Sequence, residues 1–331
     1  MGAFGRRGCV VTIGLMLLGI GSGSASGQPA AFPARPITIV VGFTPGGGND
    51  VVARVVGAKV GELLRTSVLV LNRPGANGAV ALDSVAKAPP DGYTIILGSS
   101  SVLAINPVVG AGSGPDPISG FVGIGTVAMT PQVLAVHPSV PAHTIRELVD
   151  LSRQKEVSIA SAGIGGLPHL AIELFQSSEK TRFVHVPYRG GAPAATDVVA
   201  GHVNGIVMDL PVVQPFVADG RMRAIALLND RRSPAMPNAA TSAEQGAGGL
   251  IAVNWYGLLA PAGTPAPVAD RLFEAFNAAV HDTSVKAKLA AIGIEPMTSA
   301  SRTDFTAFLK QEIARWADVA KTADLTSKSG G

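Results

Sequence analysis

Short apolar runs alternate with segments of helical period over most of the chain. Residues 37–43 form a continuous β-branched run, and residues 50–64 after it repeat apolar positions at helical spacing. The alternation recurs, with apolar runs at 68–71, 94–97, 133–136, 158–160, 184–186, 206–208, 224–227 and 255–260 and helical segments at 80–86, 144–153, 168–176 and 192–200. Buried strands between helices are typical of parallel sheets covered on both faces. The pattern predicts an α/β fold with two mainly parallel sheets flanked by helices.

The C-terminal part follows a different pattern. Beyond residue 260 it is almost wholly helical, with helices predicted over 267–281, 284–292 and 301–321. A helical tail without further strands is expected to pack back on an existing sheet. The glycine-rich segments 110–125 and 241–254 read as irregular crossing points. Since 331 residues suit about two domains, we predict one lobe from 32–129 plus 255–331 and a second lobe from 130–254.

Composition and charge narrow the class of protein. The chain is 47% apolar and 15% charged, so it can bury enough surface to fold and is not a disordered protein. The sequence pI is about 9.1 and the net charge +3, but Arg6 and Arg7 lie in a segment that we expect to be removed. The remainder carries a net charge of +1 and has no run of Lys or Arg. Nucleic-acid binding is therefore not expected.

Residues 1–27 read as a cleavable secretory signal. Arg6 and Arg7 precede an apolar run over 10–20 and a small-residue tail over 21–27, which predicts cleavage before Gln28. The alternative, a retained membrane anchor, needs a run of about 20 apolar residues, and this run is shorter. The single cysteine, Cys9, leaves with the signal, so the mature chain has no disulfide and no thiolate metal site. These features predict a periplasmic protein.

The sharpest local feature is a glycine-rich loop over residues 42–50, between a strand and a helix. Converging backbone N–H groups at the positive end of a helix can hold an anion. The loop is no Walker A motif, because no Lys-Ser/Thr follows, and Val51 breaks the dinucleotide-binding spacing. A simple tight turn is the alternative interpretation. Asp50 is a candidate helix-capping carboxylate or a direct ligand contact.

A second glycine-rich loop, residues 161–169, also joins a strand to a helix. Pro168 suits the first turn of that helix. Two such loops, one in each predicted lobe, suggest a ligand clamped between facing helix N-termini. Ser99 and Ser100 follow one strand end and Tyr188 follows another, where ligands of α/β proteins bind.

Enzymatic interpretations have little support in the sequence. The six histidines show no metal-binding spacing, so neither a metal nor a cofactor is expected. Ser161 or Ser99 with His169 is a possible hydrolase pair, although a histidine near a helix start more often caps or packs. Asp197 and Asp209 have no evident catalytic partner and read as acids of a helix face or a loop. We therefore expect no catalytic residues.

Several motifs together resemble the Bordetella uptake gene family, the substrate-binding proteins of tripartite tricarboxylate transporters. The resemblance runs from Phe32 to Trp316. It rests on Phe32-Pro33, Pro36-Ile37, Phe43, Pro45-Gly46-Gly47, Asp50, Ala53-Arg54, Asn72-Arg73-Pro74-Gly75-Ala76, Gly78, Pro90-Asp91-Gly92-Tyr93-Thr94, Gly163, Gly165, His169-Leu170, Val186-Pro187-Tyr188-Arg189-Gly190, Arg232-Ser233-Pro234, Pro237, Glu244-Gln245-Gly246, Trp255-Tyr256-Gly257-Leu258 and Pro261-Ala262-Gly263-Thr264-Pro265.

The resemblance implies a two-lobed periplasmic binding protein fold, of type II-like form, with the ligand in the cleft between the lobes. It implies a non-enzymatic, monomeric receptor that captures a small carboxylate for the membrane permease subunits of the transporter. A ligand-binding subunit of a sensory system is the alternative that the family also permits. In such proteins backbone groups and bridging waters of both glycine-rich loops hold a carboxylate. The residues expected to bind the ligand are Phe43, Thr44, Gly46, Gly47, Asp50, Ser99, Ser100, Gly163, Gly165, Gly166, His169, Tyr188 and Asp209.

Three positions depart from the family pattern. Gly42 stands where the family usually has Pro, which loosens the strand end, and Ala240 replaces a Pro before Thr241. Gly166 replaces the usual Ser or Thr and removes a hydroxyl donor from the second loop. Since neither glycine-rich loop contains Arg or Lys, backbone N–H groups are expected to hold the anion, with Arg189 at the rim.

Overall fold

The computed structural model describes residues 1–3, 5, 32–109 and 114–325. The chain divides into two units, residues 1–31 and residues 32–331. Most of the predicted signal, with its cleavage point before Gln28, lies outside the described residues and stays a prediction. Within the described part of the chain, no helix is both long and apolar enough to cross a bilayer. The fold below is that of the second unit.

The first half of this unit is built on three parallel strands. β1 (Ile37–Val41) lies between β2 (Val68–Asn72) and β3 (Thr94–Ser99) and pairs with both in parallel. Helices follow these strands in the expected alternation: α1 (Gly48–Leu64), η1 (Ala76–Gly78), α2 (Ala79–Ala86), η2 (Ser101–Ile105) and α3 (Asn106–Val109). β1 is buried along most of its length, which agrees with its continuous apolar sequence.

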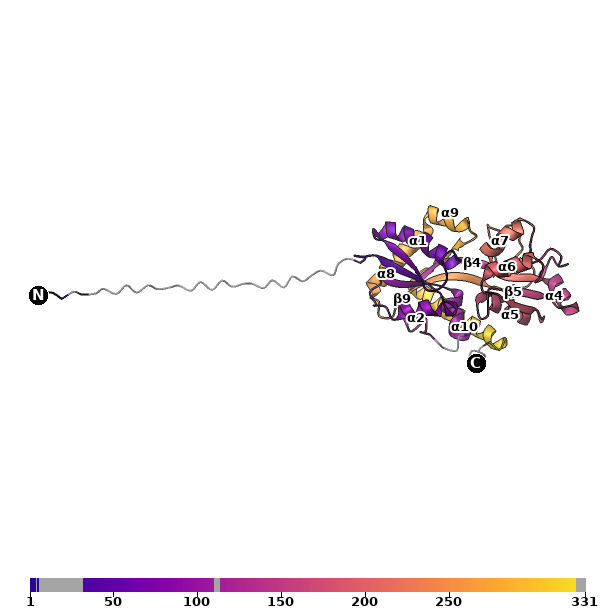
Figure 1. Cartoon of the computed structure of the whole chain (residues 1–331), viewed down its shortest axis with the longest axis horizontal. Helices are drawn as coiled ribbons and strands as arrows, with labels where there is room; N and C mark the ends of the chain where they lie inside the picture. Colours follow the sequence, from indigo (N-terminus) through magenta and orange to yellow (C-terminus); the bar gives the residue numbers. More distant parts are fainter. Residues whose placement is uncertain (4, 6–31, 110–113, 326–331) are drawn as a thin grey trace. The chain divides into compact units, whose positions relative to one another are not determined.

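A second parallel group is built in the same way. β5 (Ser158–Ser161) lies between β6 (Val184–Pro187) and β7 (Gly205–Asp209). The helices of this part are α4 (Ile145–Gln154), α5 (Leu167–Ser178), α6 (Gly191–Val199) and α7 (Leu210–Ala218). The α/β class is therefore confirmed. In Figure 1, β4 runs between the region that carries α1, α2 and α8 and the region that carries α4 to α7.

Two antiparallel strands join the parallel groups into one ten-stranded sheet. β9 (Val253–Pro261) pairs with β3 and with the first part of β4 (Phe121–Val136). The last part of β4 pairs with β7 and with β8 (Arg223–Leu227). The sheet is thus mixed at its centre, where β9 joins the first parallel group to β4 and β4 continues into the second group.

The start of β4 corrects the last part of the interpretation of residues 110–125 as irregular, because residues 121–125 are strand. β4 starts at Phe121 and continues for 16 residues. Two of its glycines lie where helices approach it: a Cβ at Gly123 would come within 2.9 Å of Thr306 Oγ1 in α10, and one at Gly125 within 3.3 Å of Phe273 Cδ2 in α8. The absence of side chains here lets the C-terminal helices approach the strand, so these glycines mark a packing surface rather than a turn.

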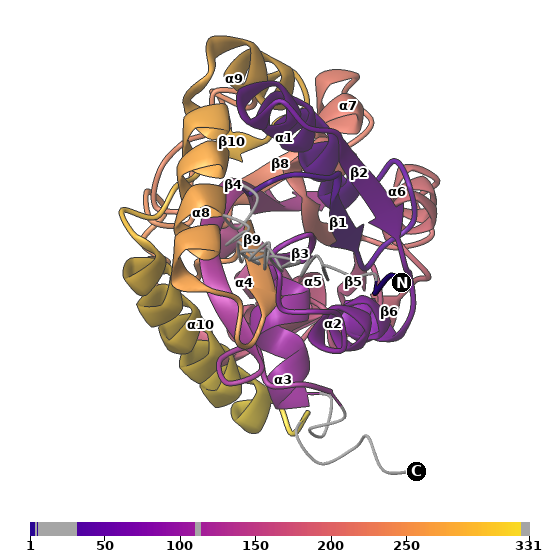
Figure 2. The ribbon, with the colours of Figure 1, turned by 90° about the vertical axis from the view of Figure 1, so that its left-hand side faces the viewer.

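The helical tail packs on the first part of the sheet. α8 (Ala266–His281) contacts α1 and β4, α9 (Thr283–Ala290) contacts α1, and α10 (Arg302–Thr322) contacts β4, η2 and α5. Figure 2 shows α8 and α10 along the side of β4. The tail is not entirely without strands, since β10 (Glu295–Pro296) pairs with β4.

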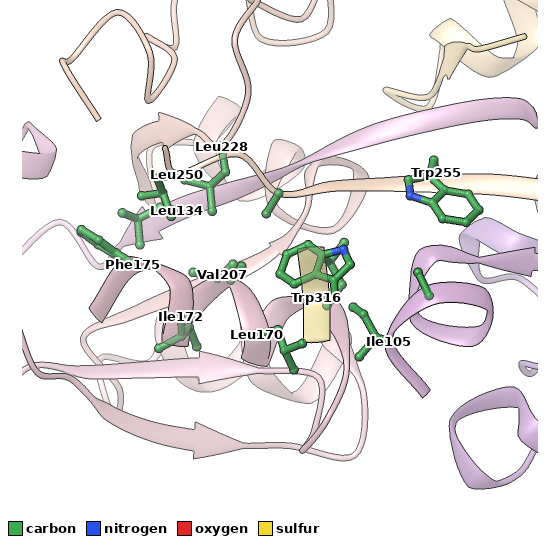
Figure 3. Close-up of a cluster of buried hydrophobic side chains, with 14 of the residues drawn as sticks. Ile105, Leu134, Leu170, Ile172, Phe175, Val207, Leu228, Leu250, Trp255 and Trp316 are labelled. Carbon is green, nitrogen blue, oxygen red and sulfur yellow. The ribbon is translucent and has the colours of Figure 1, made fainter. Parts of the chain in front are cut away.

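The main hydrophobic core includes residues from both parallel groups. Trp316 of α10 is fully buried and belongs to one cluster with Leu170 of α5 and Ile105 of η2. Figure 3 shows these side chains together, with Phe175 and Val207 further into the second group.

One element missing from the sequence-based prediction is α7, whose proline at 215 inside the helix disfavours a helical interpretation.

Candidate functional site

A cleft of about 450 Å³ opens among the N-terminal ends of three helices. Gly47 and Gly48 line it at the start of α1, Gly166 and Leu167 at the start of α5, and Gly190 and Gly191 at the start of α6. The N-cap residue of each helix is glycine, which has no side chain to accept a hydrogen bond from the N–H groups of the first turn. Such ends present backbone N–H groups and a partial positive charge, which suit an anion.

Asp50 stabilises the first glycine-rich loop through hydrogen bonds. This buried carboxylate accepts hydrogen bonds from Gly46 N–H at 3.0 Å, from Arg54 Nε at 2.9 and 3.0 Å, and from Asn72 Nδ2 at 3.0 Å. Burial alone raises the pKa of Asp50, but these hydrogen bonds outweigh it and lower the pKa below its usual value. Asp50 is thus a support of the loop, and it does not line the cleft.

Gly42 is explained by a close approach of two backbone segments. A Cβ at Gly42 would lie 2.6 Å from the Cα of Gly78. Gly78 itself has a φ of +91°, in the region that favours glycine. The departure from Pro at position 42 therefore goes with tight packing at this strand end, rather than with the loosening that we expected.

The second glycine-rich loop is held by a serine and two stacked histidines. Ser161 Oγ lies 2.6 Å from His185 Nε2 and accepts a hydrogen bond from Gly163 N–H at 3.2 Å. Gly165 N–H donates to His169 Nδ1 at 3.1 Å, and the rings of His169 and His185 stack with centroids 4.0 Å apart. Burial lowers the pKa of His185 to about 4, so this histidine is neutral at pH 7.

The hydrolase pair of Ser161 with His169, one of the two that the sequence left open, does not form in the structure. Ser161 contacts His185 rather than His169, and Ser161 is fully buried. His169 is 5% exposed, and its two ring nitrogens lie against Gly165 N–H and, at 3.5 Å, against the Glu173 carboxylate. Both side chains therefore stabilise the second glycine-rich loop through hydrogen bonds to its backbone.

Asp209 forms a polar cluster at the junction of three strands. Its Oδ1 accepts a hydrogen bond from Gln132 Nε2 of β4, and its Oδ2 accepts one from Asn254 Nδ2 of β9 at 3.0 Å. Asn254 Oδ1 in turn accepts a hydrogen bond from Ser100 Oγ at 3.0 Å. Burial raises the pKa of Asp209, and the two amide hydrogen bonds offset only part of this effect.

The structure brings about half of the predicted ligand-binding residues to the cleft. The predicted residues that line it are Phe43, Thr44, Gly47, Ser99, Gly163, Gly166 and Asp209. The others, which do not line it, are Gly46, Asp50, Ser100, Gly165, His169 and Tyr188. Two of the second set act behind the cleft lining: Ser100 orients Asn254, and His169 holds the second glycine-rich loop at Gly165.

Tyr188 is directed to a different partner. Its hydroxyl donates to Asp197 Oδ2 at 2.7 Å. Burial and this carboxylate raise the pKa of Tyr188 to about 12, while the hydrogen bond from Tyr188 lowers the pKa of Asp197. Arg189, the next residue, is exposed and does line the cleft.

Asn49, Ser101 and Asn254 are three polar side chains that line the cleft and were not among the predicted ligand contacts. Asn49 is 8% exposed beside the first loop, and its Oδ1 has no hydrogen-bond partner. Ser101 Oγ accepts a hydrogen bond from Leu167 N–H at 3.1 Å and so connects η2 with the start of α5. No local sequence signal marks Asn254 as a cleft residue, since the pairing of β9 with β4 is what places it there. Among the described residues, no group of three or more His, Cys, Asp or Glu side chains is placed to hold a metal ion.

Comparison with known proteins gives a consistent result. The family model described as tripartite tricarboxylate transporter family receptor matches residues 52–325. The chain is similar to protein BugT of Bordetella pertussis, with 33% identity over 88% of this chain and 90% of BugT. It is similar in structure to Rpa4515 of R. palustris, solved with adipate, with 34% identity, a TM-score of 0.80 and coverage of 88% of this chain and 98% of that one. MatC of Rhodopseudomonas palustris, solved with bound malate, has 27% identity, a TM-score of 0.77 and coverage of 87% and 99%.

Proposed function

Because the chain belongs to the tripartite tricarboxylate transporter receptor family, we propose that it is a non-enzymatic periplasmic receptor that captures a small carboxylate. The carboxylate binds in the cleft described above and is delivered to the membrane permease subunits of the transporter. The observation that carries this proposal is the convergence of three glycine-capped helix N-termini on one cleft of about 450 Å³. Adipate and malate, the ligands of the two similar structures, are the first probes.

We propose that residues 32–129 with 255–331 form one lobe and residues 130–254 the other. The support is that each parallel group of strands has its own helices, while β4 pairs with strands of both groups through β9 and β7, and α10 contacts both η2 and α5. The backbone passes between the groups near residue 131 in β4 and near residue 253 in β9. Limited proteolysis tests this assignment, because cleavage into two sequential halves near residue 165 would contradict it.

Backbone N–H groups are the main anion ligands in this proposal. A hydrogen bond to a charged group contributes about 1.5–3 kcal/mol net, so several N–H donors suffice for micromolar binding near about −8 kcal/mol. Arg189 is the only Lys or Arg among the described residues that line the cleft, and its side chain is exposed. Exposure to water weakens its contribution. The glycine loops therefore matter more than the guanidinium group.

A pair of substitutions tests the mechanism by calorimetric titration with adipate and malate. In Gly47→Val the new Cβ has no neighbour closer than Thr44 O at 3.7 Å, and the backbone at φ −77° accepts any residue. The valine side chain occupies the place of the carboxylate, so affinity falls at least tenfold, whereas Arg189→Ala has a smaller effect. Loss of binding in Arg189→Ala with normal binding in Gly47→Val would show that a guanidinium clamp holds the ligand.

The non-enzymatic role and the monomeric state have their own tests. A receptor raises its melting temperature with ligand concentration by mass action and leaves the ligand chemically unchanged. A hydrolase would instead release product and lose activity in Ser161→Ala. Light scattering of the mature chain tests the monomer, and co-purification with the permease subunits tests the transport partner.

A further inference from the structure

Asp209 is a carboxylate in the cleft for which the protein supplies no cation. Its hydrogen-bond partners are two neutral amides, those of Gln132 and Asn254, and among the described residues no Lys, Arg or His interacts with it. It lines the same cleft as the glycine-rich loops. A partly buried carboxylate is normally paired with a cation, because desolvation disfavours the charged form. The missing partner must therefore come from a proton or from the ligand.

The orientation of the neighbours favours an ionised carboxylate. Each Asp209 oxygen accepts one N–H, and the Ser100 hydroxyl on Asn254 Oδ1 keeps the Asn254 Nδ2 directed at Asp209. An ionised carboxylate has about four acceptor positions, so two remain for a ligand. Burial, and then the charge of Asp209, raise the pKa of Tyr256, whose hydroxyl lies 3.5 Å from Asn254 Nδ2.

A second acceptor lies near the same cluster, the side-chain oxygen of Asn49, and this one has no hydrogen-bond partner. Asn49 lines the cleft and is 8% exposed, and its Oδ1 makes no hydrogen bond. Its neighbour Gly48 lies against the Tyr256 hydroxyl, since a Cβ at Gly48 would be 2.5 Å from that oxygen. Gly48 lies against Tyr256, Tyr256 lies against Asn254, and Asn254 bonds Asp209, so this chain of contacts connects the start of α1 with the carboxylate. The helix N-termini of the cleft offer donors, whereas this cluster offers acceptors.

We infer that the carboxylate ligand of this receptor also carries an ammonium group, which Asp209 and Asn49 bind. This inference rests on the proposed function and narrows its ligand class to amino-substituted carboxylates. The ligand carboxylate lies at the glycine-capped helix ends, and its ammonium supplies the cation that Asp209 lacks. An ammonium has three donors and no acceptor, which matches a set of acceptors. A ligand with a second carboxylate in this position would place two like charges together.

Matched pairs of probes test the inference by calorimetric titration of the mature chain. The pairs are 2-aminoadipate with adipate and aspartate with succinate, which differ only by the amino group. Malate adds a hydroxyl-bearing analogue of aspartate. We expect the wild-type protein to bind the amino member of at least one pair ten times more tightly than its partner. Asp209→Asn, which keeps the shape and loses the charge, should bring that ratio close to one through weaker binding of the amino acid.

Asp219→Asn is the matched control. Asp219 is an exposed aspartate at the other end of α7, paired with Arg221 and outside the cleft lining. Its loss changes the net charge by the same amount and should leave the ratio of each pair unchanged. A melting curve of Asp209→Asn shows whether that variant folds, and the wild-type ratio decides the matter even if it does not.

The outcomes separate the inference from the function on which it rests. If the wild-type protein binds only the amino-free acids, or if Asp209→Asn leaves the preference unchanged, the inference is wrong and the carboxylate receptor stands. Tighter binding of amino-free acids at lower pH would show instead that a protonated Asp209 donates to the ligand. If no probe of either kind binds, both the inference and the proposed function are wrong.

Discussion

The contact between Gly48 and Tyr256 fixes the position of the first helix turn beside the cleft, and it can be tested directly. In Gly48→Ala the new Cβ would lie 2.5 Å from the Tyr256 hydroxyl oxygen and 3.5 Å from Cζ. Tyr256 is fully buried, and its hydroxyl oxygen is fixed to a rigid ring, so the oxygen cannot move away from the new Cβ. Overpacking of this kind costs about 1–3 kcal/mol. Alanine regains about 0.5–1 kcal/mol because glycine loses more backbone entropy on folding.

We therefore expect Gly48→Ala to lower the free energy of unfolding by about 1–2 kcal/mol. With an unfolding entropy of about 0.6 kcal/mol per kelvin for a chain of about 300 residues, the melting temperature falls by about 2–3 °C. Circular dichroism melts and urea denaturation both measure the change. The partner substitution, Tyr256→Phe, removes the clashing oxygen and leaves only the ordinary 3.5 Å contact.

A double-mutant cycle then isolates the contact from other effects. Tyr256→Phe alone loses only the 3.5 Å hydrogen bond with Asn254 and should cost about 1 kcal/mol or less. In the double variant the clash is absent, so the two changes should couple by at least about 1 kcal/mol. If Gly48→Ala is as stable as the wild type, or if Tyr256→Phe does not relieve it, the close packing of α1 on β9 is not as described.

Three further predictions concern other parts of the fold. Gly42→Ala places Cβ 2.6 Å from the Cα of Gly78; because backbone must move, it should destabilise by about 3 kcal/mol or more in urea denaturation, and no single side-chain truncation should rescue it. Thr144 Oγ1 caps α4 by accepting Glu147 N–H at 3.1 Å, so Thr144→Ala should cost about 1 kcal/mol in the same assay, whereas Thr144→Ser should cost much less. Burial lowers the pKa of His185 from 6.5 to about 4; the unfolded chain therefore binds a proton that the folded chain does not, and stability falls as pH drops from about 6.5 to about 4, by at most about 3 kcal/mol. Comparing wild type with His185→Gln at pH 7, 5 and 4 isolates this effect, and parallel pH profiles would contradict it.

The sequence by itself determined the local elements of this protein. Continuous β-branched runs predicted buried strands such as β1, and apolar residues at helical spacing predicted helices such as α1 and α8 to within a few residues. The glycine-rich loops were evident for the same reason, because glycine and proline act on the backbone of their own neighbours. Motifs spread from Phe32 to Trp316 indicated the family, which the match over residues 52–325 confirms.

Only the tertiary structure decided what depends on contacts between distant segments. The start of β4 was predicted as irregular because Gly123 and Gly125 are typical of loops. In the structure these glycines let α8 and α10 approach the strand. α7 was missed because Pro215 is unfavourable in a helix and only packing overrides that preference. Asn254 reaches the cleft through the pairing of β9 with β4, and Ser161 meets His185 rather than His169 because β5 and β6 are neighbours. Local propensity acts within a few residues along the chain, whereas the partners of a buried polar group are set by strand register and packing between segments far apart in sequence.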